Sequence, residues 1–133
     1  MDSTNAIKAV TVISKNITPL KTLEAKLYAL SFSDELTRLY NRRGCFTLAD
    51  QQLKISRRTK KPMPLIFADL NDFKLINDTF GHDTGDSALR ECTAILKQTF
   101  RESDIIARIG GDEFVILITA FKAGEEGAYL KRL

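Results

Sequence analysis

Two short apolar runs enclose a pair of glycines and a pair of acids in Arg108-Ile109-Gly110-Gly111-Asp112-Glu113-Phe114-Val115-Ile116-Leu117. This order predicts a β-hairpin, with strands over Ile105–Ile109 and Phe114–Thr119 and adjacent carboxylates at its tip. The glycines let a bulky, charged ligand approach the backbone, and carboxylates on a rigid turn can hold a divalent cation. An ordinary Gly-Gly turn with solvated acids explains the same segment.

A second apolar run, Leu65-Ile66-Phe67-Ala68, ends in Asp69. It is typical of a fully buried central strand, and a carboxylate at the carboxyl end of such a strand is common in α/β active sites. If the hairpin pairs beside this strand, Asp69 meets Asp112 and Glu113. Hard oxygen ligands favour Mg²⁺ or Mn²⁺, whereas the single histidine and the cysteine spacing disfavour zinc.

The residues that follow Asp69 suit a nucleotide. A helix is predicted to begin at Asn71-Asp72-Phe73-Lys74 and to stop at Gly81, and the N–H groups at its start, together with Lys74, would attract phosphate. Metal, helix terminus and lysine fit phosphoryl or nucleotidyl transfer. The polar residues expected in a base pocket are Asn77, His82 and Asp86. Helix capping explains the asparagine and the aspartate equally, and a surface imidazole explains the histidine.

Further helices are predicted on both sides of these strands, which gives an α/β class with helices on an antiparallel or mixed sheet. A helix over Leu20–Leu30 carries leucines at the spacing of a coiled-coil seam, or of one stripe on a globular helix. A strand-like run, Ala9–Ser14, precedes it, and a final helix could begin at Gly124. The apolar faces expected on the two long helices are Phe46, Ala49 and Leu53 within Asn41–Arg58, and Ala88, Leu89, Cys92, Ile95, Leu96 and Thr99 after Gly85-Asp86.

Composition excludes several classes of protein. The chain has 133 residues, of which 44% are apolar and 28% charged, and a net charge of +3. Its apolar runs of about six residues are far shorter than the roughly 20 that span a membrane, and no signal-peptide pattern is present. The weak charge and the lack of aromatic residues beside basic clusters disfavour nucleic-acid binding. Cys45 and Cys92 fit a reduced, cytoplasmic protein.

Five ordered blocks carry a family resemblance. They are Asp34-Glu35-Leu36-Thr37, Asn41-Arg42-Arg43, Asp69 to Asp78, Gly81 to Asp86, and Gly110 to Phe114. From about Ser33 to about Leu133 the chain resembles the GGDEF domain of bacterial diguanylate cyclases. The resemblance implies a palm-like, nucleotidyl-cyclase-like α/β domain that condenses two GTP into cyclic di-GMP and two pyrophosphates.

The resemblance also implies roles for individual residues. Asp69, the Leu70 backbone carbonyl and Asp112 would hold Mg²⁺ (or Mn²⁺). Asp112 would be the base for the ribose 3′-hydroxyl, Glu113 would assist at the metal, and Lys74 would stabilise phosphate charge. The nucleotide would be held by Asn77 and Asp86 at guanine, His82 nearby, Leu36 and Leu89 along the base, and Phe73, Gly110 and Gly111.

A second motif matches the family's RxxD inhibitory site. Arg101-Glu102-Ser103-Asp104 ends five residues before Gly110. It resembles a product-binding site for feedback inhibition, with Arg101 forking onto phosphate or guanine. A surface ion pair at a helix end is the alternative. Two positions depart from the family pattern, because Arg38 stands where Gly is usual and Asn71 where Asp is frequent.

The N-terminal segment Val12 to Lys21 is similar to the last strand and exit of a PAS sensor domain. We therefore expect residues 1–19 to be the remnant of a sensor, 20–32 a signalling helix, and 33–133 a GGDEF domain without its C-terminal strands and basic helix. The active unit is expected to be a homodimer through the linker helix, attached to a membrane only by an upstream anchor. The alternatives are a non-catalytic module that binds GTP or cyclic di-GMP, and a dimerisation fragment.

Overall fold

The computed structural model of the protein describes residues 18–122, 124, 127–128 and 131. The strand-like run Ala9–Ser14 and most of the PAS-like segment lie outside these residues. Most of the helix expected after Gly124 lies outside them as well. These two predictions therefore remain predictions.

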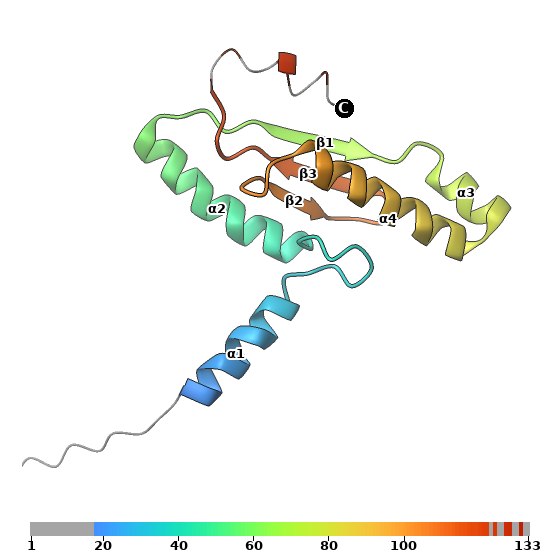
Figure 1. The fold of residues 1–133 in the computed structure, drawn as a ribbon, viewed down its shortest axis with the longest axis horizontal. Coiled ribbons are helices and arrows are strands. Elements are labelled where there is room, and N and C mark those ends of the chain that lie inside the picture. The colour runs from blue at the N-terminus through green and yellow to red at the C-terminus, as the bar shows by residue number, and fades with distance from the viewer. Residues whose placement is uncertain (1–17, 123, 125–126, 129–130, 132–133) are drawn as a thin grey trace, which may run out of the picture.

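Two helices precede the first described strand, and two more precede the other two strands. They are α1 (Thr18–Leu30), α2 (Arg42–Thr59), β1 (Leu65–Asp69), α3 (Phe73–Phe80), α4 (His82–Thr99), β2 (Ile105–Arg108) and β3 (Glu113–Leu117). The three strands form one sheet in the order β1-β3-β2, with both pairs antiparallel. Helices lie against this sheet, while α1 extends away from it (Figure 1). The expected α/β class and the hairpin are confirmed.

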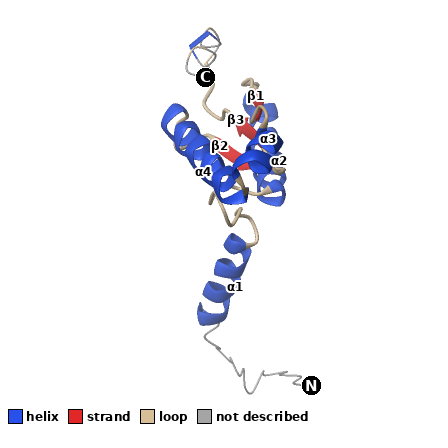
Figure 2. Ribbon diagram, turned by 90° about the vertical axis from the view of Figure 1, so that its right-hand side faces the viewer, coloured by secondary structure: helices blue, strands red, loops and turns tan. Residues whose placement is uncertain are grey.

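The central strand β3 supplies both faces of the core. Phe114 and Ile116 join a large apolar cluster with Leu89 and Leu96 of α4. Val115, which points to the opposite face, packs with Cys45 of α2 and with Ala107. Successive side chains of a strand alternate between faces, so one short apolar run can pack against a helix on each side. Figure 2 shows the sheet between α4 on one side and α2 on the other.

Strand β1 differs from its expected position. The sequence predicts a fully buried central strand, but among the described strands β1 lies at the edge of the sheet. Leu65 and Phe67 are 60% and 57% exposed, whereas Ile66 and Ala68 pack against the large cluster. A continuous apolar run therefore contributes only alternate residues to the described core, because no described element covers the other face of this strand.

Helix α3 ends before Gly81 as expected, but it begins at Phe73, after Asn71 and Asp72. Helix α4 begins earlier than predicted. Gly81, with φ 88°, ends α3 and immediately precedes α4, which starts at His82 instead of at Gly85. The phase of α4 on the sheet is set by Leu89, Thr93 and Leu96, all buried. Ile95 is exposed for this reason, contrary to prediction, since it lies on the flank of the buried stripe.

Helix α2 also turns a different face inward. Phe46 and Leu53 are exposed, while Cys45 is buried against the sheet. The helix approaches β2 with small residues, which lets its backbone lie close to the strand. Phe46, Ala49 and Leu53, which the sequence predicts to form one buried face, therefore do not together form the surface that contacts the sheet.

Helix α1 carries the predicted leucine spacing on an exposed surface. Leu20, Leu23 and Leu27 are between 55% and 59% exposed. The helix is confirmed, and the partner that would cover its leucines remains a prediction. Among the described residues no helix is both long and apolar enough to cross a membrane.

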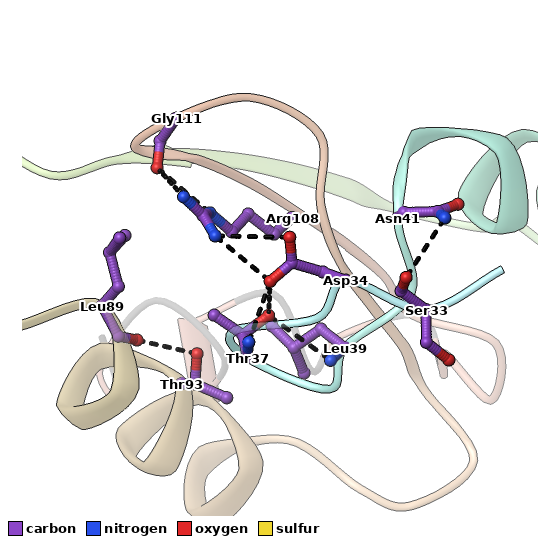
Figure 3. A network of polar contacts seen from close by, with 9 residues as sticks. All are labelled: Ser33, Asp34, Thr37, Leu39, Asn41, Leu89, Thr93, Arg108 and Gly111. Carbon is purple, nitrogen blue, oxygen red and sulfur yellow. Dashed lines mark hydrogen bonds and ion pairs between the residues drawn. The ribbon is translucent and has the colours of Figure 1, made fainter. Parts of the chain in front are cut away.

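The turn between α1 and α2 is tied to the sheet by backbone and side-chain bonds. Asn41 caps α2 by accepting from the Gly44 N–H at 2.9 Å, and its amide donates to the Ser31 carbonyl at 2.9 Å. The same amide donates to the Ser33 carbonyl at 3.3 Å (Figure 3). Tyr40 exchanges backbone hydrogen bonds with residues of β2 at its outer edge. The turn thus continues the sheet beyond β2.

One ion pair joins this turn to the hairpin tip. The Arg108 guanidinium donates to both Asp34 carboxylate oxygens at 3.1 and 3.3 Å and, from Nε and Nη2, to the Gly111 carbonyl at 3.1 and 2.8 Å (Figure 3). The side chains of Arg108 and Asp34 are only 15% and 23% exposed. Burial alone raises the pKa of the Asp34 carboxyl, but hydrogen bonds from Thr37 and the charge of Arg108 outweigh it and hold that pKa below its usual value.

We expect Asp34→Asn to lower the free energy of unfolding at pH 7 by about 1–2 kcal/mol, because it removes charge-assisted hydrogen bonds from a mostly buried group. Because the native pKa is lowered, this contribution is full above the unfolded-state pKa of about 3.9 and disappears as the pH falls through the native pKa. Urea unfolding at pH 7 and at pH 3 measures the difference between wild type and variant.

The matched control is Asp50→Asn, which removes the same charge from an exposed pair with Lys54 on α2. Its cost should stay below about 0.5 kcal/mol. Equal destabilisation by the two variants at pH 7 would contradict the role given to Asp34.

Candidate functional site

The carboxyl end of β1 lies beside the hairpin tip. Asp69 is the register partner of Glu113. The Leu70 N–H donates to the Asp112 carbonyl at 3.2 Å, which extends this pairing by one residue. Directly opposed residues of antiparallel strands place their side chains on the same face. The backbone therefore brings together the segments that carry all three candidate metal-binding acids.

The side chains of these acids are not gathered around one point. The Glu113 carboxylate lies against Gly110, where it fills the space that a Cβ would need. Asp69 is exposed, and within the described part of the chain no three His, Cys, Asp or Glu side chains form a group suited to a metal. The Leu70 carbonyl accepts no hydrogen bond from the described residues. This all-oxygen donor set fits Mg²⁺ chemically, and Glu113 would have to turn away from Gly110 to join it.

The start of α3 follows directly from this strand end. Asp72 adopts a left-handed conformation, with φ 56°, and its side chain does not cap the helix. Phe73 packs partly buried against the large apolar cluster, whereas Lys74 is exposed. The chain thus turns sharply between the acidic strand end and a helix start whose first N–H groups lack a side-chain cap, which is favourable for phosphate.

The residues expected in a base pocket lie on α3 and α4, which pack against each other. The Asn77 side chain is half-buried, and its Oδ1 lies in the space that a Cβ on Gly85 would occupy. Asp86 is half-buried next to that glycine, while His82 is exposed at the start of α4. The absence of a side chain at Gly85 therefore allows Asn77 to sit against α4 near Asp86.

Leu36 and Leu89, expected along the base, belong to the core. Leu89 is 1% exposed and Leu36 packs partly buried on the same cluster. Either residue would contribute to a nucleotide site as part of its apolar floor. Burial also raises the pKa of the Cys45 and Cys92 thiols, which disfavours either as a nucleophile.

The two glycines of the hairpin tip have different surroundings. Gly110 is half-buried below the Glu113 carboxylate, and Gly111 is exposed with its carbonyl held by Arg108. Sequence reasoning assigned no role to Arg108. Its partner Asp34 lies 74 positions away, and no local pattern connects two residues at that separation.

A cavity lies at the candidate inhibitory motif. It measures about 490 Å³ and is lined by Ser33, Arg38, Leu39, Tyr40, Lys97, Phe100, Arg101, Glu102, Asp104 and Ile106. Asp104 is buried and accepts from the backbone N–H groups of Arg101 and Thr119, both at 3.1 Å. Among the described residues the Arg101 guanidinium forms no ion pair with Asp104. The described structure thus shows no ion pair within this motif, and its inhibitory role remains a prediction.

Known proteins are similar to this chain in sequence and in fold. Residues 31–132 match the family described as "Diguanylate cyclase, GGDEF domain". The probable diguanylate cyclase DgcC of Escherichia coli K12 is 39% identical over 106 residues, which are 80% of this chain and 29% of that protein. The chain thus spans less than a third of this relative's length. The match begins at residue 31, so the PAS-like resemblance remains a prediction.

Solved structures of GGDEF proteins have a similar fold. Diguanylate cyclase SiaD of Pseudomonas aeruginosa, solved with its activator SiaC, superposes with a TM-score of 0.74 at 33% identity, over 86% of this chain and 44% of that one. A microbial GGDEF domain, reported in an interaction with bis-(3′,5′)-cyclic di-GMP, gives 0.70 at 35% identity, over 79% and 65%. With the family match covering most of its residues, the chain belongs to the GGDEF family of diguanylate cyclase domains.

Proposed function

We propose that the protein is a diguanylate cyclase, which condenses two GTP into cyclic di-GMP and two pyrophosphates with Mg²⁺ (or Mn²⁺). The register of β1 and β3 carries this proposal, because it brings Asp69 opposite Glu113 and links Leu70 to Asp112. The helix pair α3–α4 follows directly on this strand end and bears the candidate phosphate and base residues.

The reaction assigns a task to each residue at the strand ends. Asp69, the Leu70 carbonyl and Asp112 would hold the metal, and Glu113 would assist after turning away from Gly110. A bound Mg²⁺ neutralises phosphate charge and lowers the barrier to hydroxyl attack. Asp112 accepts the proton of the 3′-hydroxyl, whose oxygen forms a bond to the α-phosphorus of the second GTP. Pyrophosphate leaves, with Lys74 stabilising its charge.

Guanine recognition would come from α3 and α4. The Asn77 amide and the Asp86 carboxylate can pair with the donor and acceptor edge of the base. His82 would lie near the nucleotide, and Leu36, Leu89 and Phe73 would support the site from the core. Gly110 and Gly111 would let the phosphates approach the backbone.

Two further proposals concern regulation and assembly. Arg101 and Asp104 border the cavity of about 490 Å³, which supports an inhibitory site for the product. A homodimer through the exposed leucines of α1 would bring two GTP-loaded domains together, as the condensation requires. Light scattering on the chain with Leu23→Lys against wild type tests the second point.

A non-catalytic module that binds GTP or cyclic di-GMP is the alternative. In such a module the Glu113 carboxylate would keep its place over Gly110. Calorimetry with each nucleotide beside a turnover assay distinguishes the two functions, because only the cyclase consumes GTP.

Replacing the proposed base tests the cyclase directly. We expect Asp112→Ala in the full-length protein to reduce cyclic di-GMP formation by at least about 100-fold, since one residue both binds the metal and accepts the proton. Chromatographic separation of the product after incubation with GTP and Mg²⁺ measures the rate. Asp50→Ala, which removes an exposed carboxylate from α2, should retain wild-type turnover. A folded wild type that makes no product, or an Asp112→Ala variant as active as wild type, would overturn the proposal.

Gly85 tests the placement of Asn77. An added methyl group in Gly85→Ala would displace the Asn77 amide from α4, so we expect the KM for GTP to rise about tenfold with a smaller change in kcat. Steady-state kinetics should give the same split for Asn77→Ala. Gly127→Ala, at a glycine with open space around it, is the matched control and should leave KM unchanged. An unaltered KM in Gly85→Ala would exclude this positioning role.

A further inference from the structure

Arg38 occupies a backbone conformation that is unfavourable for its residue type. Its φ is 59°, in the left-handed region that a side chain with a Cβ rarely adopts. Lys60 and Asp72 are the other non-glycine residues with positive φ in the described part of the chain. Strained backbone retained at a cavity is a reason to look for a function of the side chain.

The turn around Arg38 is firmly held. The Arg38 N–H donates to the Asp34 carbonyl at 2.8 Å. The Asp34 carboxylate in turn accepts from Thr37 and Arg108, which ties the turn to the hairpin. The strained conformation is therefore imposed by the surrounding hydrogen bonds, so a residue at this position keeps its direction whatever its side chain.

Arg38, from the turn before α2, is among the residues that line the cavity of about 490 Å³. Lys97 and Arg101 supply two more cations to the same lining. Of the two lining carboxylates, Asp104 is buried and already accepts from two backbone N–H groups. The lining thus holds three cations from two separate segments and, besides the bonded Asp104, one exposed carboxylate, that of Glu102. This excess of cations suits a ligand with more than one phosphate.

We propose that Arg38 is a phosphate-binding residue of this cavity, and that it pairs with one phosphodiester of a cyclic dinucleotide while Arg101 contacts the rest of the ligand. The inference rests on the inhibitory site in the proposed function and adds a determinant from the turn before α2. A guanidinium suits this task because its planar fork can bind a phosphate through two hydrogen bonds.

Replacing Arg38 with glycine removes the guanidinium without adding strain to the backbone. Glycine adopts positive φ freely, so Arg38→Gly should unfold at the same temperature as wild type or higher. Its affinity for cyclic di-GMP, measured by calorimetry on this chain, should fall about tenfold, the loss expected for one charge-assisted contact at an exposed side chain. Arg38→Lys, which keeps the charge without the fork, should lose less.

Lys60→Gly is the matched control. Lys60 is also a cation at positive φ, with φ 53° at the end of α2, and it does not line the cavity. The control should raise the unfolding temperature without changing the affinity. Arg101→Ala tests where cyclic di-GMP binds. If the ligand occupies this cavity, the affinity of this variant for cyclic di-GMP should also fall.

The outcomes separate the proposals. Wild-type affinity in Arg38→Gly, with weakened binding in Arg101→Ala, overturns the role of Arg38 and leaves the inhibitory site in place. Wild-type chain that does not bind cyclic di-GMP, or binds it equally in all variants, overturns both. Weakened binding in Arg38→Gly, together with a full-length protein that makes no cyclic di-GMP, supports this inference and overturns the cyclase.

Discussion

The antiparallel pairing of β1 with β3 is the constraint on which the candidate site depends. It aligns Ile66 with Ile116 and Ala68 with Phe114 inside the large cluster, and the same register sets Asp69 opposite Glu113. A slip by one residue would move every side chain of β1 to the other face. The register that buries the apolar residues of β1 therefore also brings the acidic segments together.

The ion pair between Arg108 and Asp34 joins segments that are distant in sequence. Arg108 lies at the end of β2, and its guanidinium reaches both the turn before α2 and the carbonyl of Gly111. Because the pair is mostly buried, its hydrogen bonds cannot be replaced by water without cost. The hairpin tip, which carries the acids, is thus held by a side chain whose hydrogen bonds in the described structure go to Gly111 and Asp34 and to no candidate metal ligand.

Local pattern was sufficient for the hairpin, the end of α3 and the meeting of the two acidic segments, because these depend on short-range order and on one strand pairing. It failed where a neighbour decides the outcome. Ile95 is exposed because α4 takes its phase from Leu89 and Leu96, and Leu65 is exposed because β1 lies at the edge of the described sheet. The Glu113 carboxylate over Gly110 and the cavity beside Arg38 depend on tertiary packing, which a linear pattern does not encode.

Gly81 has a mechanical consequence. A single residue separates α3 from α4, and it serves both as the end of one helix and as the start of the other. A joint of one residue has almost no slack, so a rotation of α3 must be passed to α4. Asn77 and Asp86 stand on opposite arms of this corner, and they would move as parts of one bent lever. Movement of the corner as one body would change the distance of both residues from the strand ends while keeping their mutual spacing.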